Sequence, residues 1–344
     1  MSDTRPQARS PFISLMGLLI AGFLGLFSEA ALNIALPDLM EVFSVSAAIV
    51  QWLTTAYLLA VGVVLPLFGL VSRWLSTRQL AVIANAAFIL GAVVCALSAD
   101  FGMLILGRVL QGIATGIMLP LLFSAAISVY PLAQRGKALG MIGLVVMFAP
   151  AVSPVVAGLI LEVATWEWIF WVTVPVMAAA LVLSLAKLPN VRELSRPHID
   201  MLSIVSSVIG FGGLVLGVSV GGEQGWTSPV VAISLLVGLL SLAVFVRRQL
   251  RSAQPFLEMR AFTSRAFSTG AIVIGLLSAV LMCTIFLIPM YLQDARLMSV
   301  LAAAFIMLPG AGERAARGAS GVCGGREHDL LHRAADRRRD WYGG

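Results

Sequence analysis

Charged residues are scarce in this chain. Asp, Glu, Lys and Arg make up 12% of its 344 residues, whereas a soluble domain carries about 25%. The mean hydropathy is +0.97, so the composition excludes an ordinary soluble globule. The net charge of +6 does not indicate a nucleic-acid partner, because the basic residues lie in short separate stretches and not on one continuous face.

Residues that build metal and catalytic sites are also few. The chain has three histidines and three cysteines, and Cys95, Cys283 and Cys323 lack the spacing of metal ligands. The sequence contains no Gly-rich phosphate loop with a lysine and no nucleophile–base constellation. It therefore predicts no enzyme, no metal and no cofactor, and it argues against an ATP-driven pump.

Long apolar runs are abundant instead. A bilayer core of about 30 Å needs about 20 apolar residues in helical form. Nine runs meet that length once their flanks are counted, and a tenth is marginal. The runs are 10–28, 42–72, 79–99, 109–134, 138–161, 168–186, 201–222, 224–246, 266–293 and 297–312. The pattern predicts an all-α polytopic membrane protein.

Basic residues between the runs fall in alternate gaps. Fourteen of them lie on the side of the amino terminus and one, Arg296, lies on the other. Because basic loops stay in the cytoplasm, the amino terminus is predicted to be cytoplasmic in a multi-pass protein of the inner or plasma membrane. Residues 73–78, 135–137 and 187–200 are then cytoplasmic, and residues 38–46 and 162–167 are external.

The apolar runs divide the chain into predicted parts. These are a transmembrane half at 12–186, a cytoplasmic connection at 187–200, a transmembrane pair at 201–246, a basic segment at 247–266, a further transmembrane start at 267–312 and a charged tail at 313–344. The tail is either a natural disordered segment or out-of-frame translation after about codon 311. The tenth run stops half-formed at Leu308, Pro309 and Gly310, which favours the second reading and predicts a poorly stable, inactive polypeptide.

Four segments carry a family resemblance. They are residues 29–37 with 51–57, residues 69–79, residues 107–116 and residues 143–158. In this order they resemble the major facilitator superfamily, in particular its 14-helix drug:proton antiporter branch, over residues 12–312. The resemblance implies a complete amino-terminal six-helix half, two inserted helices and the start of the second half. It also implies a secondary transporter that exports drugs or other amphiphilic compounds in exchange for protons by alternating access.

Glu29, Arg108 and Gln111 are the predicted proton-coupling residues. Glu29 lies inside the first span and Arg108 inside the fourth, where charged side chains are costly and must face a cavity or find a partner. Gln111 shares a helix face with Arg108. The role in coupling comes from the resemblance. The alternatives are that Glu29 is a snorkelling residue near the outer mouth and that Arg108 is a structural clamp.

Asn33, Gln51, Trp52 and Tyr57 are the predicted lining of a substrate cavity. They are polar or aromatic and lie around the outer half of the first two spans. Trp52 is equally well explained as an anchor at the membrane interface.

Gly69, Arg73 and Arg78 form the predicted gating loop between the second and third spans. The family motif normally has an acidic residue here, but Ser72 or Arg73 occupies its place. The gating ion pair of the family is therefore not expected in its usual form.

Gly143, Pro150, Pro154 and Gly158 mark the predicted antiporter-motif helix. The prolines interrupt the backbone hydrogen bonds and predict a kink. The glycines predict close approach of neighbouring helices, although membrane helices tolerate Pro and Gly in general.

The predicted partners are a small amphiphilic substrate, protons and the lipid bilayer, and the oligomeric state is not indicated. Two other functions fit the same sequence. One is a transporter fragment without activity, and the other is a non-transport membrane protein such as a sensor or an assembly partner.

Overall fold

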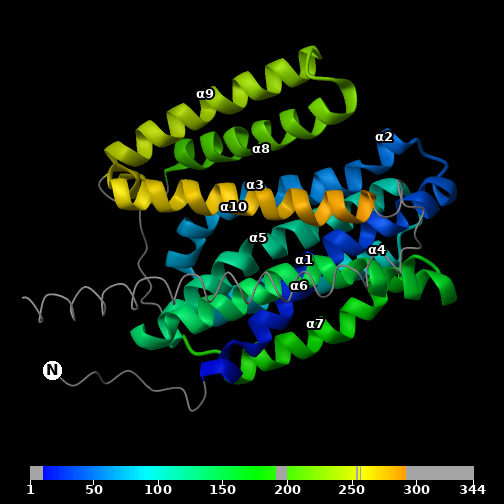
Figure 1. The fold of residues 1–344 in the computed structure, drawn as a ribbon, viewed down its shortest axis with the longest axis horizontal. Helices are drawn as coiled ribbons and strands as arrows, with labels where there is room; N and C mark the ends of the chain where they lie inside the picture. The colour runs from blue at the N-terminus through cyan, green and yellow to red at the C-terminus, as the bar shows by residue number, and fades with distance from the viewer. Residues whose placement is uncertain (1–10, 191–199, 253–254, 256, 292–344) are drawn as a thin grey trace, which may run out of the picture. The chain divides into compact units, whose positions relative to one another are not determined.

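The computed structural model describes residues 11–190, 200–252, 255 and 257–291. Every regular element in these ranges is a helix (Figure 1). In chain order the helices are α1 (Pro11–Val42), α2 (Ala47–Val50), α3 (Trp52–Trp74), α4 (Thr77–Ala96), α5 (Phe101–Val129), η1 (Leu132–Gln134), α6 (Arg135–Val163), α7 (Glu167–Lys187), α8 (Met201–Gln224), α9 (Pro229–Arg251), η2 (Met259–Thr263) and α10 (Arg265–Met290).

Eight stretches of the described chain are long and apolar enough to cross a membrane. They are α1, α2 with α3, α4, α5, η1 with α6, α7, α8 and α9. Helix α10 contains a shorter apolar stretch, Arg265–Val280, which overlaps the ninth predicted run. The tenth predicted run and the charged tail at 313–344 lie outside the described residues.

Short loops are possible because polar side chains cap the helix ends. Ser76 and Gln79 form a capping box at the start of α4, in which each side chain bonds the backbone N–H of the other residue. Asp100 accepts a hydrogen bond of 2.9 Å from the Met103 backbone N–H at the start of α5. Only two residues therefore separate α3 from α4, and four separate α4 from α5.

The segment between the first two membrane-length helices is shorter than the sequence predicts. Residues 38–46 were expected to form a gap, but α1 continues through Pro37 to Val42. The prediction failed because Asp38 and Glu41 are exposed on the last turns of the helix, where charge does not have to interrupt helical structure. Ser44, with φ of 51°, then reverses the chain toward α2.

Helices α1 and α3 to α7 share one large apolar core. Helix α5 packs on α3, α4, α1 and α6, while α1 also packs on α6 and α7. The α4–α5 contact depends on glycines, which have no side chain. A Cβ added at Gly107 would lie 2.5 Å from Cys95 Sγ and 2.8 Å from the Gly91 carbonyl oxygen. Small residues in this position let two membrane helices touch along their backbones.

Helices α8 and α9 form an antiparallel hairpin (Figure 1). Glycines again allow close contact, because a Cβ at Gly213 would lie 2.9 Å from the Ser234 carbonyl oxygen. The hairpin is attached to the first group of helices through the packing of α8 on α3. A second apolar cluster joins the parts near this contact. It contains Leu70 and Phe245, with Ile204, Phe211, Leu242, Val246, Leu257 and Met259 packed against them.

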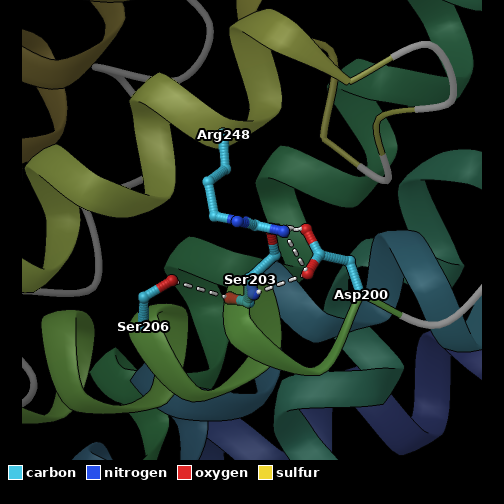
Figure 2. A network of polar contacts seen from close by, with 4 residues as sticks. All are labelled: Asp200, Ser203, Ser206 and Arg248. Carbon is cyan, nitrogen blue, oxygen red and sulfur yellow. Dashed lines mark hydrogen bonds and ion pairs between the residues drawn. The ribbon is translucent and has the colours of Figure 1, made fainter.

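A polar network links α8 and α9 at the end of the hairpin opposite its connecting loop. The Asp200 carboxylate accepts hydrogen bonds from the backbone N–H and hydroxyl group of Ser203, which caps the amino terminus of α8. The Arg248 guanidinium of α9 donates to both carboxylate oxygens over 3.0 and 2.9 Å (Figure 2). These bonds lower the pKa of the Asp200 carboxyl group to about 2. One carboxylate thus caps α8 and ties it to α9.

Candidate functional site

Arg108 lies in the middle of the contact between α1, α3 and α5. It is fully buried and is among the largest side chains with no exposed surface. Its Nη1 group donates to Gln111 Oε1 over 2.9 Å and to Ser28 Oγ over 3.1 Å. Longer bonds of 3.4 Å reach the carbonyl oxygens of Ser28 and Leu53. A permanent cation is therefore held by neutral oxygen atoms from three helices.

Tyr57 completes this arrangement from α3. The Arg108 guanidinium carbon lies 4.4 Å from the centroid of the tyrosine ring, within the range of a cation–π interaction. The Tyr57 hydroxyl group lies 2.8 Å from the Gly25 carbonyl oxygen and 2.9 Å from Thr115 Oγ1. Thr115 in turn donates to the Gln111 carbonyl oxygen over 3.0 Å. The network fixes the ring over the guanidinium, and it joins α1, α3 and α5.

Small residues make this three-helix contact possible. A Cβ added at Gly112 would lie 2.5 Å from the Tyr57 carbonyl oxygen and 2.8 Å from the Ala60 Cβ. A Cβ at Gly25 would lie 2.7 Å from Thr115 Oγ1. The helices consequently approach closely enough to enclose the guanidinium, and the energetic value of each polar contact rises in the low-dielectric interior.

Glu29 lies next to Ser28 on α1 and is half-buried. Its carboxyl group interacts electrostatically with Arg108. Among the described residues, however, no hydrogen bond or ion pair joins the two side chains, and the single ion pair recorded is the one between Arg248 and Asp200. The Nη2 group of Arg108 and the Nε2 group of Gln111 are buried donors without a partner in the described chain.

The unpartnered donors of Arg108 and Gln111 affect which groups can bind at this contact. Buried donors without partners are costly, so the site favours any acceptor that reaches them. The carboxylate that interacts electrostatically with Arg108 is that of Glu29. An ionised Glu29 would gain from the guanidinium, whereas a protonated one would not, so the protonation state of one carboxyl group can bias the contact between α1 and α5.

The predicted coupling and cavity residues are only partly brought together. Arg108, Gln111 and Tyr57 form one network, with Glu29 beside it. Asn33 instead accepts a hydrogen bond of 3.2 Å from Thr54 Oγ1. Gln51 and Trp52 are exposed at the start of α3, so these two do not line a common site with Tyr57 in the described structure.

The gating-loop arginines bind backbone oxygen atoms. Arg73 donates to the Pro255 carbonyl oxygen over 2.9 Å. Arg78 donates to the Leu188 carbonyl oxygen at the end of α7 over 3.1 and 3.3 Å, and its backbone N–H bonds Asn190 Oδ1. Gly69 accepts from the Ser72 hydroxyl group. These bonds connect the loop to the segments that follow α7 and α9.

The antiporter-motif helix makes its contact through different residues from those predicted. Helix α6 runs without a break through Pro150 and Pro154. A Cβ at Gly143 or Gly158 would meet no atom within 4 Å, so the predicted close approach at these glycines is not formed by the described helices. Ala149, Ser153 and Ala157 are buried instead, and Ser153 Oγ bonds the Phe27 carbonyl oxygen of α1 over 3.2 Å.

Ser28 and Thr115 are site residues that the sequence reasoning missed. Thr115 lies four residues after Gln111 and seven after Arg108, which places all three on one helix face. That periodicity was a usable signal. Ser28 had a weaker signal, its position beside Glu29. The carbonyl contacts of Leu53 and Gly25 had none, because every residue has a carbonyl group.

Sequence comparisons give the same family over most of the chain. The family model of the Major Facilitator Superfamily matches residues 18–326. The lincomycin resistance protein LmrB of Listeria monocytogenes is 44% identical over 307 residues, which cover 89% of this chain and 65% of that protein. The multidrug export protein EmrB of Escherichia coli K12 is 29% identical over 285 residues, covering 82% and 56%. The chain thus spans between 56% and 65% of the length of these relatives.

Solved structures resemble the fold. The xylose transporter XylE from E. coli, in a partially occluded inward-open conformation, has a TM-score of 0.58 at 14% identity and covers 92% of this chain and 74% of its own. The peptide transporter POT in complex with sulfate has a TM-score of 0.56 at 15% identity, covering 82% and 61%. At these identities the likeness concerns the fold alone.

Proposed function

This chain belongs to the Major Facilitator Superfamily, and we propose that it exports amphiphilic, drug-like molecules across the cell membrane in exchange for protons. The predicted resemblance, the helical membrane fold and the absence of an enzymatic role are confirmed by the family match and the relatives. Two relatives are named for lincomycin resistance and multidrug export. The substrate class proposed for this chain follows from those names.

The buried Arg108 network is the observation that carries the proposal. A permanent charge inside a membrane protein is expensive and usually marks an ion or substrate pathway. Here the charge has two neutral side-chain acceptors, an aromatic ring and one nitrogen that has no partner among the described residues. A purely structural clamp would be expected to use every donor. The unpaired donor fits a group whose partner changes during a cycle.

In the proposed cycle, Glu29 carries the proton. When Glu29 is ionised, its carboxylate is attracted to Arg108, which favours one arrangement of α1 against α5. Protonation removes that attraction and favours the other arrangement. A proton gradient can therefore drive alternating exposure of a site between helices, which is the general mechanism of secondary transporters.

Flux measurements with matched carboxylate variants test this proposal. A form of the protein extended to the full length of relatives such as LmrB is reconstituted in proteoliposomes, and accumulation of lincomycin is followed after an imposed pH jump. We expect gradient-driven accumulation that a proton ionophore abolishes. Glu29→Gln should lose the gradient-driven component, while Glu41→Gln, which removes an exposed carboxylate from the same helix, should retain it. Accumulation that is insensitive to the ionophore, or unchanged in Glu29→Gln, would contradict proton coupling through this residue.

The orientation is also proposed, with the amino terminus in the cytoplasm on the basis of the basic gaps. Single cysteines at positions 42 and 136 test it in a background without the native cysteines. Val42 and Gly136 suit this purpose, because Val42 is exposed and a Cβ at Gly136 meets no atom within 4 Å. A membrane-impermeant thiol reagent added to whole cells should label position 42 and spare position 136. The reverse labelling pattern would show that the protein has the opposite orientation in the membrane.

A further inference from the structure

The carboxyl-terminal end of α9 carries a surface groove of about 490 Å³. Four of its six lining residues are apolar, and two are arginines. The lining consists of Leu242, Ala243, Val246, Arg247, Leu250 and Arg251. Because α9 is long and apolar enough to cross a membrane, this end lies where acyl chains give way to lipid headgroups.

The arginines around this groove differ in what they bind. Arg248 is engaged with Asp200 on the other side of the hairpin (Figure 2). Arg260 donates to the carbonyl oxygens of Leu250 and Ser252 at the end of α9. Arg247 and Arg251 are exposed, and within the described residues neither has a hydrogen bond or an ion pair. Two of the four guanidinium groups are thus available to a ligand.

The two available arginines lie one helical turn apart. Like charges at positions i and i+4 of a helix repel each other, so their pairing here is slightly destabilising in isolation. A single anion between them removes that repulsion and accepts hydrogen bonds from both. Phosphate oxygens match the planar donor fork of arginine well. The charge pattern therefore favours a phosphate-containing anion at the solvent-facing end of the groove.

The apolar lining indicates what is attached to that anion. Leu242, Ala243 and Val246 precede the arginines along α9, so they lie deeper in the membrane-crossing stretch. Basic residues at the ends of membrane helices commonly hold anionic headgroups. We propose that this groove binds an anionic glycerophospholipid, with its phosphate between Arg247 and Arg251 and an acyl chain along the three apolar residues. The site depends on membrane insertion of α9 and not on transport.

Lipid titration of the purified full chain in detergent, followed by native mass spectrometry, tests the site. Phosphatidylglycerol should bind more tightly than phosphatidylethanolamine. The double variant Arg247→Gln/Arg251→Gln should bind phosphatidylglycerol about 30-fold more weakly, since each basic residue at a membrane surface contributes roughly fivefold. The control Lys187→Gln/Arg265→Gln removes the same charge from exposed positions outside the groove, and it should keep the affinity within about twofold.

Two further arms separate the parts of the ligand. Ala243→Trp fills the apolar part without changing charge, and it should also weaken phosphatidylglycerol binding. Glycerol 3-phosphate and inorganic phosphate should not compete at concentrations that saturate the lipid site. Equal affinity for the two lipids, an unaffected arginine variant, or full competition by free phosphate would each overturn the proposal. Equal losses in the arginine variant and its charge-matched control would do the same, because they would indicate a general surface effect.

Discussion

Charged side chains lie in different environments in two regions of the molecule. One region is the contact between α1, α3 and α5, and the other is the hairpin of α8 and α9. The first encloses Arg108 completely and surrounds it with neutral oxygen atoms and an aromatic ring. The hairpin packs its middle through glycines and places Arg248 and Asp200 at one end, where both side chains remain partly exposed. Both parts use small residues for close approach, but only the first uses that closeness to bury a charge.

This difference in the burial of charge distinguishes two roles of charged residues in membrane helices, which are function and structural stability. A surface ion pair is screened by water and contributes little to stability, so the Asp200–Arg248 pair suits the task of holding two helix ends together. A fully buried cation is costly to desolvate, and its retention points to a role other than stability. We therefore expect functional losses without unfolding in the first region, and modest stability losses without a transport defect in the second.

The largest expected effect comes from replacing Arg108 with an apolar residue of similar length. Arg108→Met should reduce proton-driven flux to the background level, because the charge that responds to Glu29 is gone. Its thermal stability in detergent should stay within about 2 kcal/mol of the parent, since lost polar contacts are offset by removal of a desolvated charge. Flux in proteoliposomes and thermal unfolding, measured on the same preparations, give the two values.

The combination of results decides between coupling and clamping. If Arg108→Met unfolds at a much lower temperature and loses flux in proportion, the residue is a clamp between helices. If it keeps normal gradient-driven flux, Arg108 has no part in transport at all.

A second prediction concerns helix packing and uses two glycines as a matched pair. Gly107→Ala should destabilise the protein by about 1–3 kcal/mol, because the new Cβ would collide with Cys95 and the α4 backbone. Gly143→Ala should be neutral or stabilising by about 0.5–1 kcal/mol, because its Cβ meets no atom within 4 Å and alanine favours helix. Chemical unfolding of both variants measures the difference, and equal effects would refute the α4–α5 contact.

The smallest expected effect is at the hairpin end. Asp200→Ala should cost about 1 kcal/mol through the lost cap of α8, while Asp200→Asn keeps the cap and should cost less. The pKa of Asp200 is lowered to about 2 by hydrogen bonds from Arg248. Its contribution to stability should therefore be complete above about pH 4 and be lost as the pH falls toward 2.

Unfolding of the parent and of Asp200→Asn between pH 6 and pH 3 provides the measurement. The parent should lose part of its advantage over the variant at the acidic end. A constant difference across that range would mean that the ion pair does not contribute to stability. Flux should be equal in the two proteins at pH 7.

Much of the fold was predictable because the bilayer imposes it. Long uncharged runs of membrane length have few stable forms other than helices, and the predicted all-helical fold is confirmed, with eight membrane-length helices in the described residues. Helix ends were less predictable. Charged residues at Asp38 and Glu41 indicated a loop, yet α1 continues past them, because exposed polar residues are compatible with the last turns of a helix.

The candidate site was only partly predictable. Arg108 and Gln111 stood out because a charge and an amide within an apolar run require partners, and the spacing of three places them on one face. The exposed positions of Gln51 and Trp52 were not deducible, since residue type does not reveal which side of a helix faces a neighbour. The glycines of α6 show the same limit, because Gly143 and Gly158 lie away from α1, while Ala149, Ser153 and Ala157 contact it or are buried beside it.

The sequence by itself determined that this protein crosses a membrane many times, where its helices lie and which helix contains a permanent charge. These properties depend on the composition and periodicity of short stretches of the chain, because the transfer of apolar residues into the bilayer depends on local sequence. Only the tertiary structure decided that Ser28, Gln111 and Tyr57 surround that charge and that Arg248 pairs with Asp200. It also decided that Glu29, Arg247 and Arg251 have no hydrogen-bond or ion-pair partner among the described residues. Partners come from helices that are distant in sequence, and close packing of small residues selects them in three dimensions.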